Sequence, residues 1–233
     1  MMKQLKLVLD QGGQNTPLSF SVKRMINAGY VGRNKAAVQS HIDELAEEGV
    51  PVPKSIPMIF PVLSRNITTS DRIEVLGDKT NGEAEFAVLF GGGRILIGVG
   101  SDHTDRELET FSISMSKQVH ENVISKTVWD LADVQDHWDE LELRSWTTAE
   151  GSDEEVLYQV AKLRSIISVT DLISLVTERL KDNAKEGLVI FSGTVPIVNE
   201  KMLYGNYFRC ELEDPVNNKI LVCEYQTERL AFL

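Results

Sequence analysis

Residues 82–102 read GEAEFAVLFGGGRILIGVGSD, which is two apolar runs joined by three glycines. Short apolar segments on either side of a glycine turn are typical of a β-hairpin. A two-residue turn at Gly92-Gly93 is a favoured hairpin loop and would pair Gly91 with Arg94. Continued along both strands, this register places Glu83 opposite Asp102.

Three carboxylates meet at the open end of this hairpin. Glu83 and Glu85 are two residues apart, so they share one face of the strand. With Asp102 opposite, the cluster is costly unless protons or a cation neutralise it. A hard divalent cation suits an all-oxygen set, so we predict Mg²⁺ or Mn²⁺, which Ca²⁺ could replace. The alternative is a solvated strand end, because a chain with 35 acidic residues contains an E-x-E by chance.

A second candidate group lies in a helix predicted over residues 34–48, with Asn34 as its N-cap. His41 and Glu44 form H-x-x-E, and a spacing of three puts them on one side of the helix, at the edge of its apolar face. A carboxylate beside an imidazole can orient it as a general base that activates water. The alternative is a surface histidine next to a solvated glutamate.

Strands outnumber helices and group together, which favours an α+β, mostly β fold over a doubly wound one. Gly193-Thr194 lies at the end of an apolar strand, where the Thr194 hydroxyl and backbone N–H groups could bind an anion; the alternative is an ordinary loop. The predicted strands are Leu5–Leu9, Leu18–Val22, Ile73–Leu76, Leu141–Trp146, Leu188–Thr194, Tyr207–Leu212 and Lys219–Tyr225. The predicted helices are residues 34–48, residues 105–122, Glu154–Lys162, and Asp171–Lys181 with Thr170 as its N-cap.

Composition excludes several classes of protein. The net charge of −11 argues against a nucleic-acid or acidic-membrane surface, which needs a basic footprint. No apolar run reaches the roughly 18 residues of a membrane span, and no signal peptide is apparent. Cys210 and Cys223 lack metal-ligand spacing, so we expect reduced thiols in neighbouring strands of a cytoplasmic protein.

Five short blocks, in chain order, resemble motifs of the fumarylacetoacetate hydrolase superfamily, which includes acylpyruvases and oxaloacetate decarboxylases. Each block is weak alone, and the ordered set is more specific. The blocks are Gly32-Arg33-Asn34 with His41-x-x-Glu44 (family G-R-N-Y-x-x-H-x-x-E), Glu83-Ala84-Glu85 (E-x-E), Asp102 to Glu107 (D-x-T-A-R-D), Ser125-Lys126 (A-K-S/G-F) and Gly187 to Pro196 (G-D-x-I-x-T-G-T-P).

The resemblance implies a mixed β-sandwich roll with peripheral helices and, usually, a homodimer. It implies one divalent metal at the three carboxylates, a substrate-contacting Lys126, and His41 with Glu44 as the catalytic dyad. Substrate anchoring would fall to Arg33, Arg106 and Thr194. We expect a single domain over residues 1–233, with N-terminal strands in 1–27 and the catalytic-type core in 28–233.

Departures from the family pattern point to an uncharacterised branch. Three extra residues separate Asn34 from His41, Lys35 replaces the usual tyrosine, and Glu107 replaces the second aspartate. We interpret the chain as a metal-dependent hydrolase or lyase that acts on C–C bonds of a small oxo-acid or diketo-acid, by hydrolysis, decarboxylation or hydration.

Two alternatives stay open. One is a non-catalytic metal- or metabolite-binding protein that retains the fold. The other is a zinc hydrolase that uses Asp102, His103 and His137.

Overall fold

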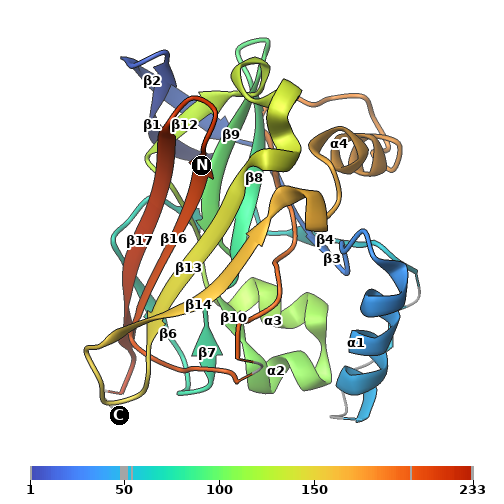
Figure 1. Cartoon of the computed structure of the whole chain (residues 1–233), viewed down its shortest axis with the longest axis vertical. Coiled ribbons are helices and arrows are strands. Elements are labelled where there is room, and N and C mark those ends of the chain that lie inside the picture. Colours follow the sequence, from blue (N-terminus) through green and yellow to red (C-terminus); the bar gives the residue numbers. More distant parts are fainter. Residues whose placement is uncertain (1, 48–51, 54, 200, 232–233) are drawn as a thin grey trace.

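The computed structural model describes residues 2–47, 52, 53, 55–199 and 201–231. Its architecture is mostly β, with a ten-stranded mixed sheet, a five-stranded sheet and a two-stranded ladder (Figure 1). Helices lie at the edges of the sheets, as Figure 1 shows for α1 at one lower corner and α4 at the upper side. The α+β, mostly β class predicted from the grouping of strands is confirmed.

The elements follow one another with short connections. The strands are β1 (Lys3–Gln11), β2 (Gln14–Val22), β3 (Arg24–Gly29), β4 (Met58–Val62), β5 (Ile67–Thr68), β6 (Arg72–Val75), β7 (Thr80–Asn81), β8 (Ala84–Gly91), β9 (Arg94–Ser101), β10 (Thr104–Asp105), β11 (Asn122–Ile124), β12 (Thr127–Asp130), β13 (Glu142–Thr148), β14 (Glu155–Lys162), β15 (Leu188–Phe191), β16 (Tyr207–Asp214) and β17 (Lys219–Arg229). The α-helices are α1 (Lys35–Glu47), α2 (Arg106–Phe111), α3 (Ile113–Val119) and α4 (Val169–Thr177).

The hairpin β8–β9 has the predicted register. Its pairs run from Gly91 opposite Arg94 to Ala84 opposite Ser101. Gly92 and Gly93 have φ of 61° and 75°, the left-handed region that glycine enters without a Cβ clash. Beyond the last pair, the Asp102 N–H donates to the Glu83 carbonyl at 3.2 Å, so these two residues face each other as predicted.

The ten-stranded sheet runs in the order β2-β1-β12-β9-β8-β15-β3-β4, with β11 and β5 attached beside β9. Its central strands are buried on both faces, which explains their near-continuous apolar sequence. One face packs on the five-stranded sheet β14-β13-β16-β17-β6 and on α4, and forms the first core. The other face, which carries Ala87 and Leu89 of β8 and Val189 and Phe191 of β15, forms a second core with β1 and β2.

Three predictions of helices need correction. Residues Glu155–Lys162 form strand β14, which pairs antiparallel with β13; β-branched and aromatic side chains outweigh the acidic start of this segment. The long helix over 105–122 is broken at Ser112, whose hydroxyl caps α3 by accepting from the Met115 N–H. Helix α4 begins two residues earlier than predicted, because the Ser168 hydroxyl is its N-cap, and it ends at Thr177.

Two other predictions, the N-cap of α1 and the positions of the two cysteines, agree with the structure. Asn34 caps α1 by accepting from the Ala36 and Ala37 N–H groups at 3.1 and 3.2 Å. Cys210 and Cys223 are buried free thiols at directly opposite positions of β16 and β17, as predicted for neighbouring strands.

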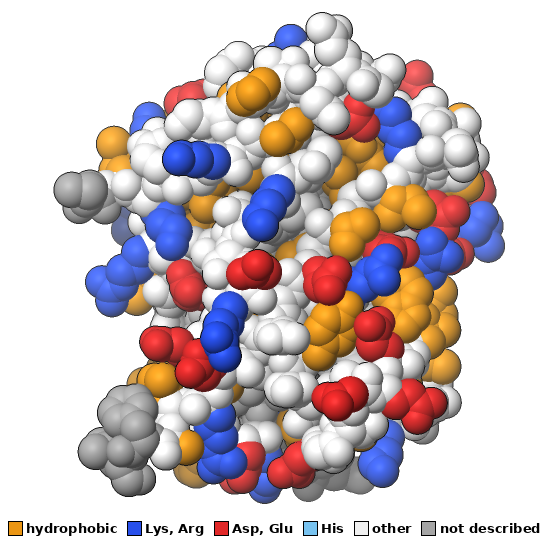
Figure 2. All heavy atoms as spheres, turned by 90° about the vertical axis from the view of Figure 1, so that its left-hand side faces the viewer, with side chains coloured by type: hydrophobic (Ala, Val, Ile, Leu, Met, Phe, Trp, Pro, Cys, Tyr) orange, Lys and Arg blue, Asp and Glu red, His pale blue; other side chains and the backbone are white. Residues whose placement is uncertain are grey.

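The surface carries mixed charge, and in Figure 2 acidic and basic side chains alternate across one whole face. Within the described part of the chain, no helix is both long and apolar enough to cross a membrane.

Candidate metal centre

The site lies where the second core changes from apolar to polar. On β8, the inward row Leu89 and Ala87 continues to Glu85. On β9, the row that starts at Leu96 continues, after two glycines, to Asp102. Side chains two apart on a strand point the same way, so both carboxylates stand at the end of the apolar interior. Glu85 is 1% exposed and Asp102 0%.

Three carboxylates converge there. Glu83, Glu85 and Asp102 each offer one oxygen, and these oxygens lie within 4.8 Å of one another. Glu85 Oε2 accepts a hydrogen bond from the Gly193 N–H at 2.8 Å. Two buried oxygens, Glu85 Oε1 and Asp102 Oδ1, have no hydrogen-bond partner among the described residues. Unsatisfied buried carboxylate oxygens are expensive, and a bound cation would satisfy both.

Two basic side chains complete the cluster. Lys117 Nζ donates to Asp102 Oδ2 and lies 3.6 Å from Glu83 Oε2. Arg106 donates from Nη2 to Glu83 Oε1 at 3.0 Å and from Nη1 to Glu109 Oε2 at 2.9 Å. Four carboxylates therefore face two basic groups, and a divalent cation would balance the difference.

The pKa shifts express this crowding. Burial and the charge of Asp102 raise the pKa of Glu85 well above its ordinary value. Burial also raises the pKa of Asp102, which Lys117 only partly offsets. For Glu83, burial is outweighed by Arg106 and Lys117, and its pKa is lowered. Burial likewise fails to lower the pKa of Lys117, because Asp102 and Glu83 raise it, so Lys117 stays protonated.

The donor set fits a hard divalent cation. Glu83, Glu85 and Asp102 supply only oxygen atoms, the ligand type that Mg²⁺ prefers over nitrogen or sulfur. The residues present are therefore compatible with the predicted metal.

His103, the residue after Asp102, is held by further polar side chains. His103 is 2% exposed, and its two ring nitrogens contact the Tyr225 hydroxyl at 2.9 Å and the Thr80 hydroxyl at 3.0 Å. Burial, with the neighbouring His120, lowers the pKa of His103 well below its ordinary value, so it is neutral. These contacts make His103 a structural residue next to Asp102. They leave its nitrogens engaged, and His137 instead lies 2.9 Å from Asp214, so the structure does not assemble the zinc alternative.

Lys117 occupies the place in the cluster that the sequence argument assigned to Lys126. Lys126 is exposed in the turn between β11 and β12. The Ser125 N–H before it bonds to the Val99 carbonyl, so Lys126 lies beside Gly98, four residues of strand from Asp102, roughly 13 Å.

The signal that identifies Lys117 lies in the burial of α3 and not in its sequence. In α3, the buried residues are Ser116 and Lys117, whereas Met115 and Val119 are exposed. A helix that turns its lysine inward and its apolar residues outward indicates a charged partner beneath it.

The three residues predicted to anchor the substrate do not all lie at the metal centre. Arg106 lies in the cluster. Thr194 lies next to Gly193, where its hydroxyl donates to the Ala84 carbonyl at 2.9 Å and accepts from Gln159 at 2.7 Å. Arg33 is engaged elsewhere, in a two-pronged ion pair with Asp139 at 2.6 and 2.9 Å.

The dyad residues His41 and Glu44 lie on α1, whose backbone is described, while their side chains lie outside the described part of the structure. Their role therefore stays a prediction.

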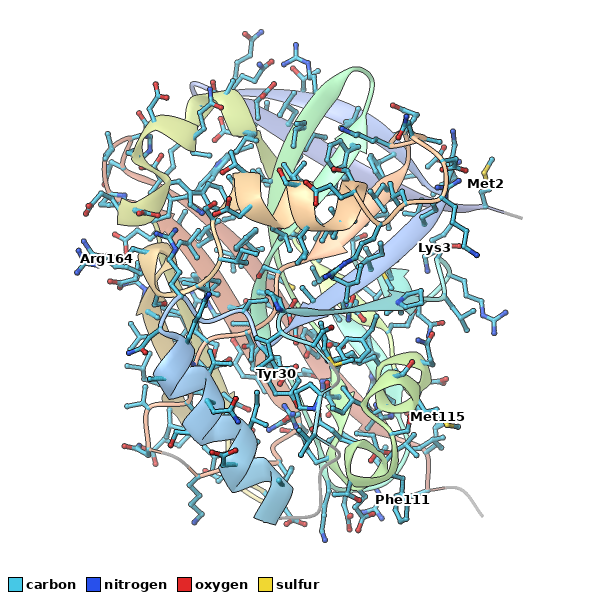
Figure 3. All side chains as sticks on the ribbon, turned by 90° about the vertical axis from the view of Figure 1, so that its right-hand side faces the viewer. Met2, Lys3, Tyr30, Phe111, Met115 and Arg164 are labelled. Atoms are coloured by element: carbon cyan, nitrogen blue, oxygen red, sulfur yellow. The ribbon has the colours of Figure 1, made fainter. Side chains whose placement is uncertain are left out.

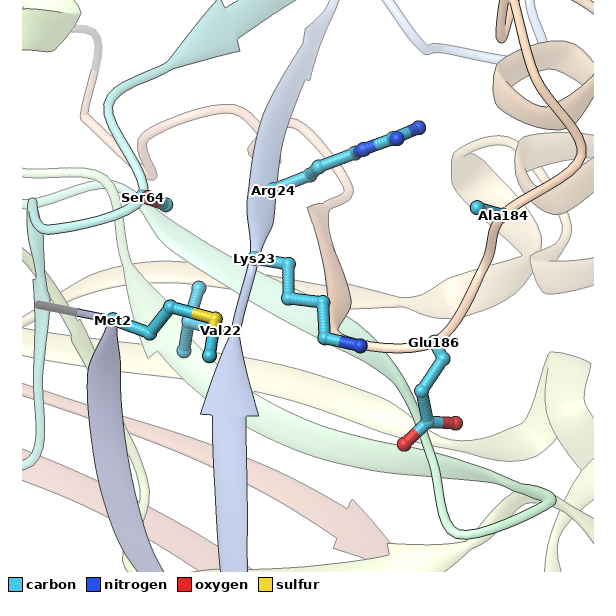
Figure 4. A pocket seen from close by; sticks show the side chains of 7 residues that line it. All are labelled: Met2, Val22, Lys23, Arg24, Ser64, Ala184 and Glu186. Carbon is cyan, nitrogen blue, oxygen red and sulfur yellow. The ribbon is translucent and has the colours of Figure 1, made fainter.

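A separate open cavity of about 680 Å³ lies away from the carboxylates (Figure 4). Its basic residue Arg24 is already paired with Asp182 at 2.5 Å. None of its lining residues belongs to the cluster; they are Met2, Val22, Lys23, Arg24, Ser64, Ala184 and Glu186.

Comparisons with known proteins identify one sequence family and several similar structures. A family described as "Protein of unknown function (DUF2848)" matches residues 28–225. No curated protein matches the chain in sequence.

Several solved structures are similar. A 2-keto-3-deoxyarabinonate dehydratase is 18% identical, with a TM-score of 0.64 over 90% of this chain and 75% of that one. Cg1458 with an inhibitor is 18% identical, with a TM-score of 0.63 over 93% and 82%. 2-Keto-3-deoxy-D-arabinonate dehydratase complexed with magnesium and 2,5-dioxopentanoate is 17% identical, with a TM-score of 0.59 over 88% and 73%. At these identities the likeness shows a common fold, the fumarylacetoacetate hydrolase type that the sequence blocks implied.

Proposed function

The chain belongs to the DUF2848 family, and we propose that it is a divalent-metal-dependent enzyme acting on a small oxo-acid. One observation carries the proposal: the buried Glu85 and Asp102 and the partly buried Glu83 converge, with two oxygens unpaired, beside a buried protonated lysine. A purely structural cluster would have its buried polar atoms satisfied.

We assign the metal to Glu83, Glu85 and Asp102. When bound, Mg²⁺ or Mn²⁺ would act as a Lewis acid that polarises the keto oxygen of the substrate. Arg106 holds Glu83, and the Gly193 N–H holds Glu85, so both carboxylates are oriented before a metal binds.

Lys117 is our candidate for binding the substrate carboxylate. An ammonium group has three donors, and the described contacts direct one to Asp102 and one toward Glu83. The third is available to an anion beside the metal. Lys117 replaces Lys126 in this role, while Thr194, on the neighbouring loop, remains a candidate for the same anion.

His41 and Glu44 remain the proposed general base and its orienting partner. A dyad on α1 would approach the substrate from the side opposite α3. If the reaction is a hydrolysis, this base would take a proton from water; if it is a dehydration or decarboxylation, it would move a proton at the carbon next to the keto group.

Two structural neighbours favour a lyase over a hydrolase. Both are dehydratases, and one of them was solved with magnesium and 2,5-dioxopentanoate bound to that protein. We therefore place dehydration or another lyase reaction first, and hydrolysis of an acylpyruvate-like substrate second.

We also propose a cytoplasmic homodimer with a single domain over residues 1–233. The N-terminal strands in 1–27 would buttress the second core, and 28–233 would form the catalytic-type core.

The test is a screen of small 2-oxo-acids with metal-stripped protein, with and without Mg²⁺. Turnover that depends on Mg²⁺ and is lost in Glu85→Gln would support the proposal. Metal and oxo-acid binding without turnover of any substrate would favour the non-catalytic alternative. No binding of either would contradict both.

A further inference from the structure

Tyr30 lies between β3 and α1 in a backbone conformation that tyrosine rarely adopts. Its φ is 56°, in the left-handed region where glycine is usual. For a bulky residue this conformation costs on the order of 1 kcal/mol or more, so it persists only where the surroundings enforce it. The other non-glycine residue with positive φ in the described chain is Asn218, which lies in the β16–β17 turn, and asparagine tolerates this region well.

The backbone on both sides of Tyr30 packs against the metal centre. A Cβ on Gly193 would meet Val31 Cγ2 at 2.8 Å and the Ala28 carbonyl oxygen at 3.0 Å, so this segment lies directly on the residue that holds Glu85. The Val31 carbonyl in turn accepts from the Ile167 N–H at 2.8 Å. The segment is therefore fixed from two sides.

The Tyr30 side chain lies near the charged cluster, because the charges of Glu109, Lys117 and Glu83 act on its phenol. Figure 3 shows it between α1, which carries His41 and Glu44, and the α2–α3 pair, which carries Glu109 and Lys117. It is half-buried, and its hydroxyl has no hydrogen-bond partner among the described contacts. Burial, then the charge of Glu109, raises the pKa of Tyr30, and Lys117 and Glu83 also act on it, so the phenol is a neutral donor.

We propose that the Tyr30 hydroxyl donates a hydrogen bond to an anionic oxygen of the small oxo-acid bound at Glu83, Glu85 and Asp102. The inference rests on the proposed function and deepens it, because it adds a specificity-determining residue opposite Lys117. The two donors would hold the substrate from different elements: Tyr30 from the loop before α1, and Lys117 from α3.

The test uses oxalate as a probe of the anion site, measured by calorimetry with Mg²⁺ saturating. Tyr30→Phe removes only the hydroxyl. We expect it to weaken oxalate binding about tenfold, as expected for one hydrogen bond to a charged group, and to leave Mg²⁺ affinity unchanged. Tyr207→Phe is the matched control, because Tyr207 lies on β16 with its hydroxyl beside Glu224.

A second variant separates function from folding. Tyr30→Gly relieves the positive φ, as Asn218→Gly does at a turn without a proposed role. Because glycine also removes a half-buried side chain, we expect Tyr30→Gly to unfold below the wild-type temperature, to keep wild-type Mg²⁺ affinity and to lose oxalate affinity. Asn218→Gly should bind oxalate as wild type does, and a Tyr30→Gly variant that binds oxalate equally well would overturn the inference.

The oxalate measurements distinguish failure of the proposed function from failure of the proposed role of Tyr30. If wild-type protein with Mg²⁺ does not bind oxalate, the proposed function fails, and the Tyr30 inference with it. If wild type binds oxalate and Tyr30→Phe binds it equally well, only the Tyr30 inference fails. Parallel loss of Mg²⁺ and oxalate affinity in Tyr30→Phe would also overturn it.

Discussion

Replacement of Glu85 by glutamine should have opposite effects on the metal-free and the metal-loaded protein. The pKa of Glu85 is raised by burial and by Asp102, so above its unfolded pKa the charged carboxylate is less stable in the folded state than in the unfolded chain. Glu85→Gln removes that cost and keeps the size and the hydrogen bond from the Gly193 N–H. The metal-free variant should therefore unfold at a higher temperature than metal-free wild type at neutral pH.

With metal, the order should reverse. At a Mg²⁺ concentration 100 times the dissociation constant, binding stabilises wild type by about 2.7 kcal/mol. For a chain of this size that corresponds to a rise of about 5 to 11 °C in unfolding temperature. Loss of one of three ligand charges should weaken binding at least about 100-fold, by comparison with the 10–100-fold effect of indirect contacts. The remaining stabilisation would be about 0.4 kcal/mol, or about 1 to 2 °C.

The assay is thermal unfolding of metal-stripped protein over a Mg²⁺ titration, checked by calorimetry. Glu150→Gln is the control, because it removes one negative charge at an exposed position in the loop after β13. A wild-type Mg²⁺ response in Glu85→Gln would refute the assignment of Glu85 as a ligand. An equal loss in Glu150→Gln would show that the effect is one of net charge.

Three further predictions concern the surrounding residues. Lys117→Met should weaken oxalate binding more than Mg²⁺ binding in calorimetry, while Lys126→Met, at an exposed position, should match wild type; the reverse order would return the role to Lys126. His41→Ala should lower turnover by about 10²–10⁴-fold with unchanged Mg²⁺ affinity, and near-normal turnover would remove the general-base mechanism. Asp214→Asn should destabilise by about 2 kcal/mol near neutral pH in urea unfolding. Burial raises the pKa of Asp214, but hydrogen bonds with His137 and Asn217 outweigh burial, so the pKa is lowered. The stability difference between wild type and Asp214→Asn should therefore be present above the unfolded pKa and shrink as pH falls through the folded pKa. A difference that is constant with pH would contradict this account.

Local sequence patterns were sufficient to predict the hairpin β8–β9 and the grouping of its carboxylates. A two-glycine turn fixes the register, and period-two alternation then fixes which side chains share a face, so Glu83, Glu85 and Asp102 could be grouped without a structure. The neighbouring strands of Cys210 and Cys223 followed from the same kind of pattern.

The partners of the carboxylates depend on contacts between distant segments. Lys117 reaches Asp102 because α3 folds back over the end of β9, and nothing in local periodicity distinguishes it from Lys126. The strand β14 was misread as a helix because an edge strand of this sheet keeps Val156, Leu157 and Val160 exposed, which erases the alternation that identifies strands. The burial of charge that defines the site is likewise a property of the packed molecule.

The central claim is that Glu83, Glu85 and Asp102 bind one divalent cation. The most direct test is a crystal structure of the protein soaked with Mn²⁺ and oxalate, with anomalous diffraction data collected near the manganese edge. We predict one anomalous peak with an oxygen of each carboxylate about 2.0–2.3 Å away, oxalate completing the coordination, and Lys117 Nζ in contact with the oxalate. A well-ordered cluster without anomalous density, or a peak bound elsewhere in the molecule, would contradict the account.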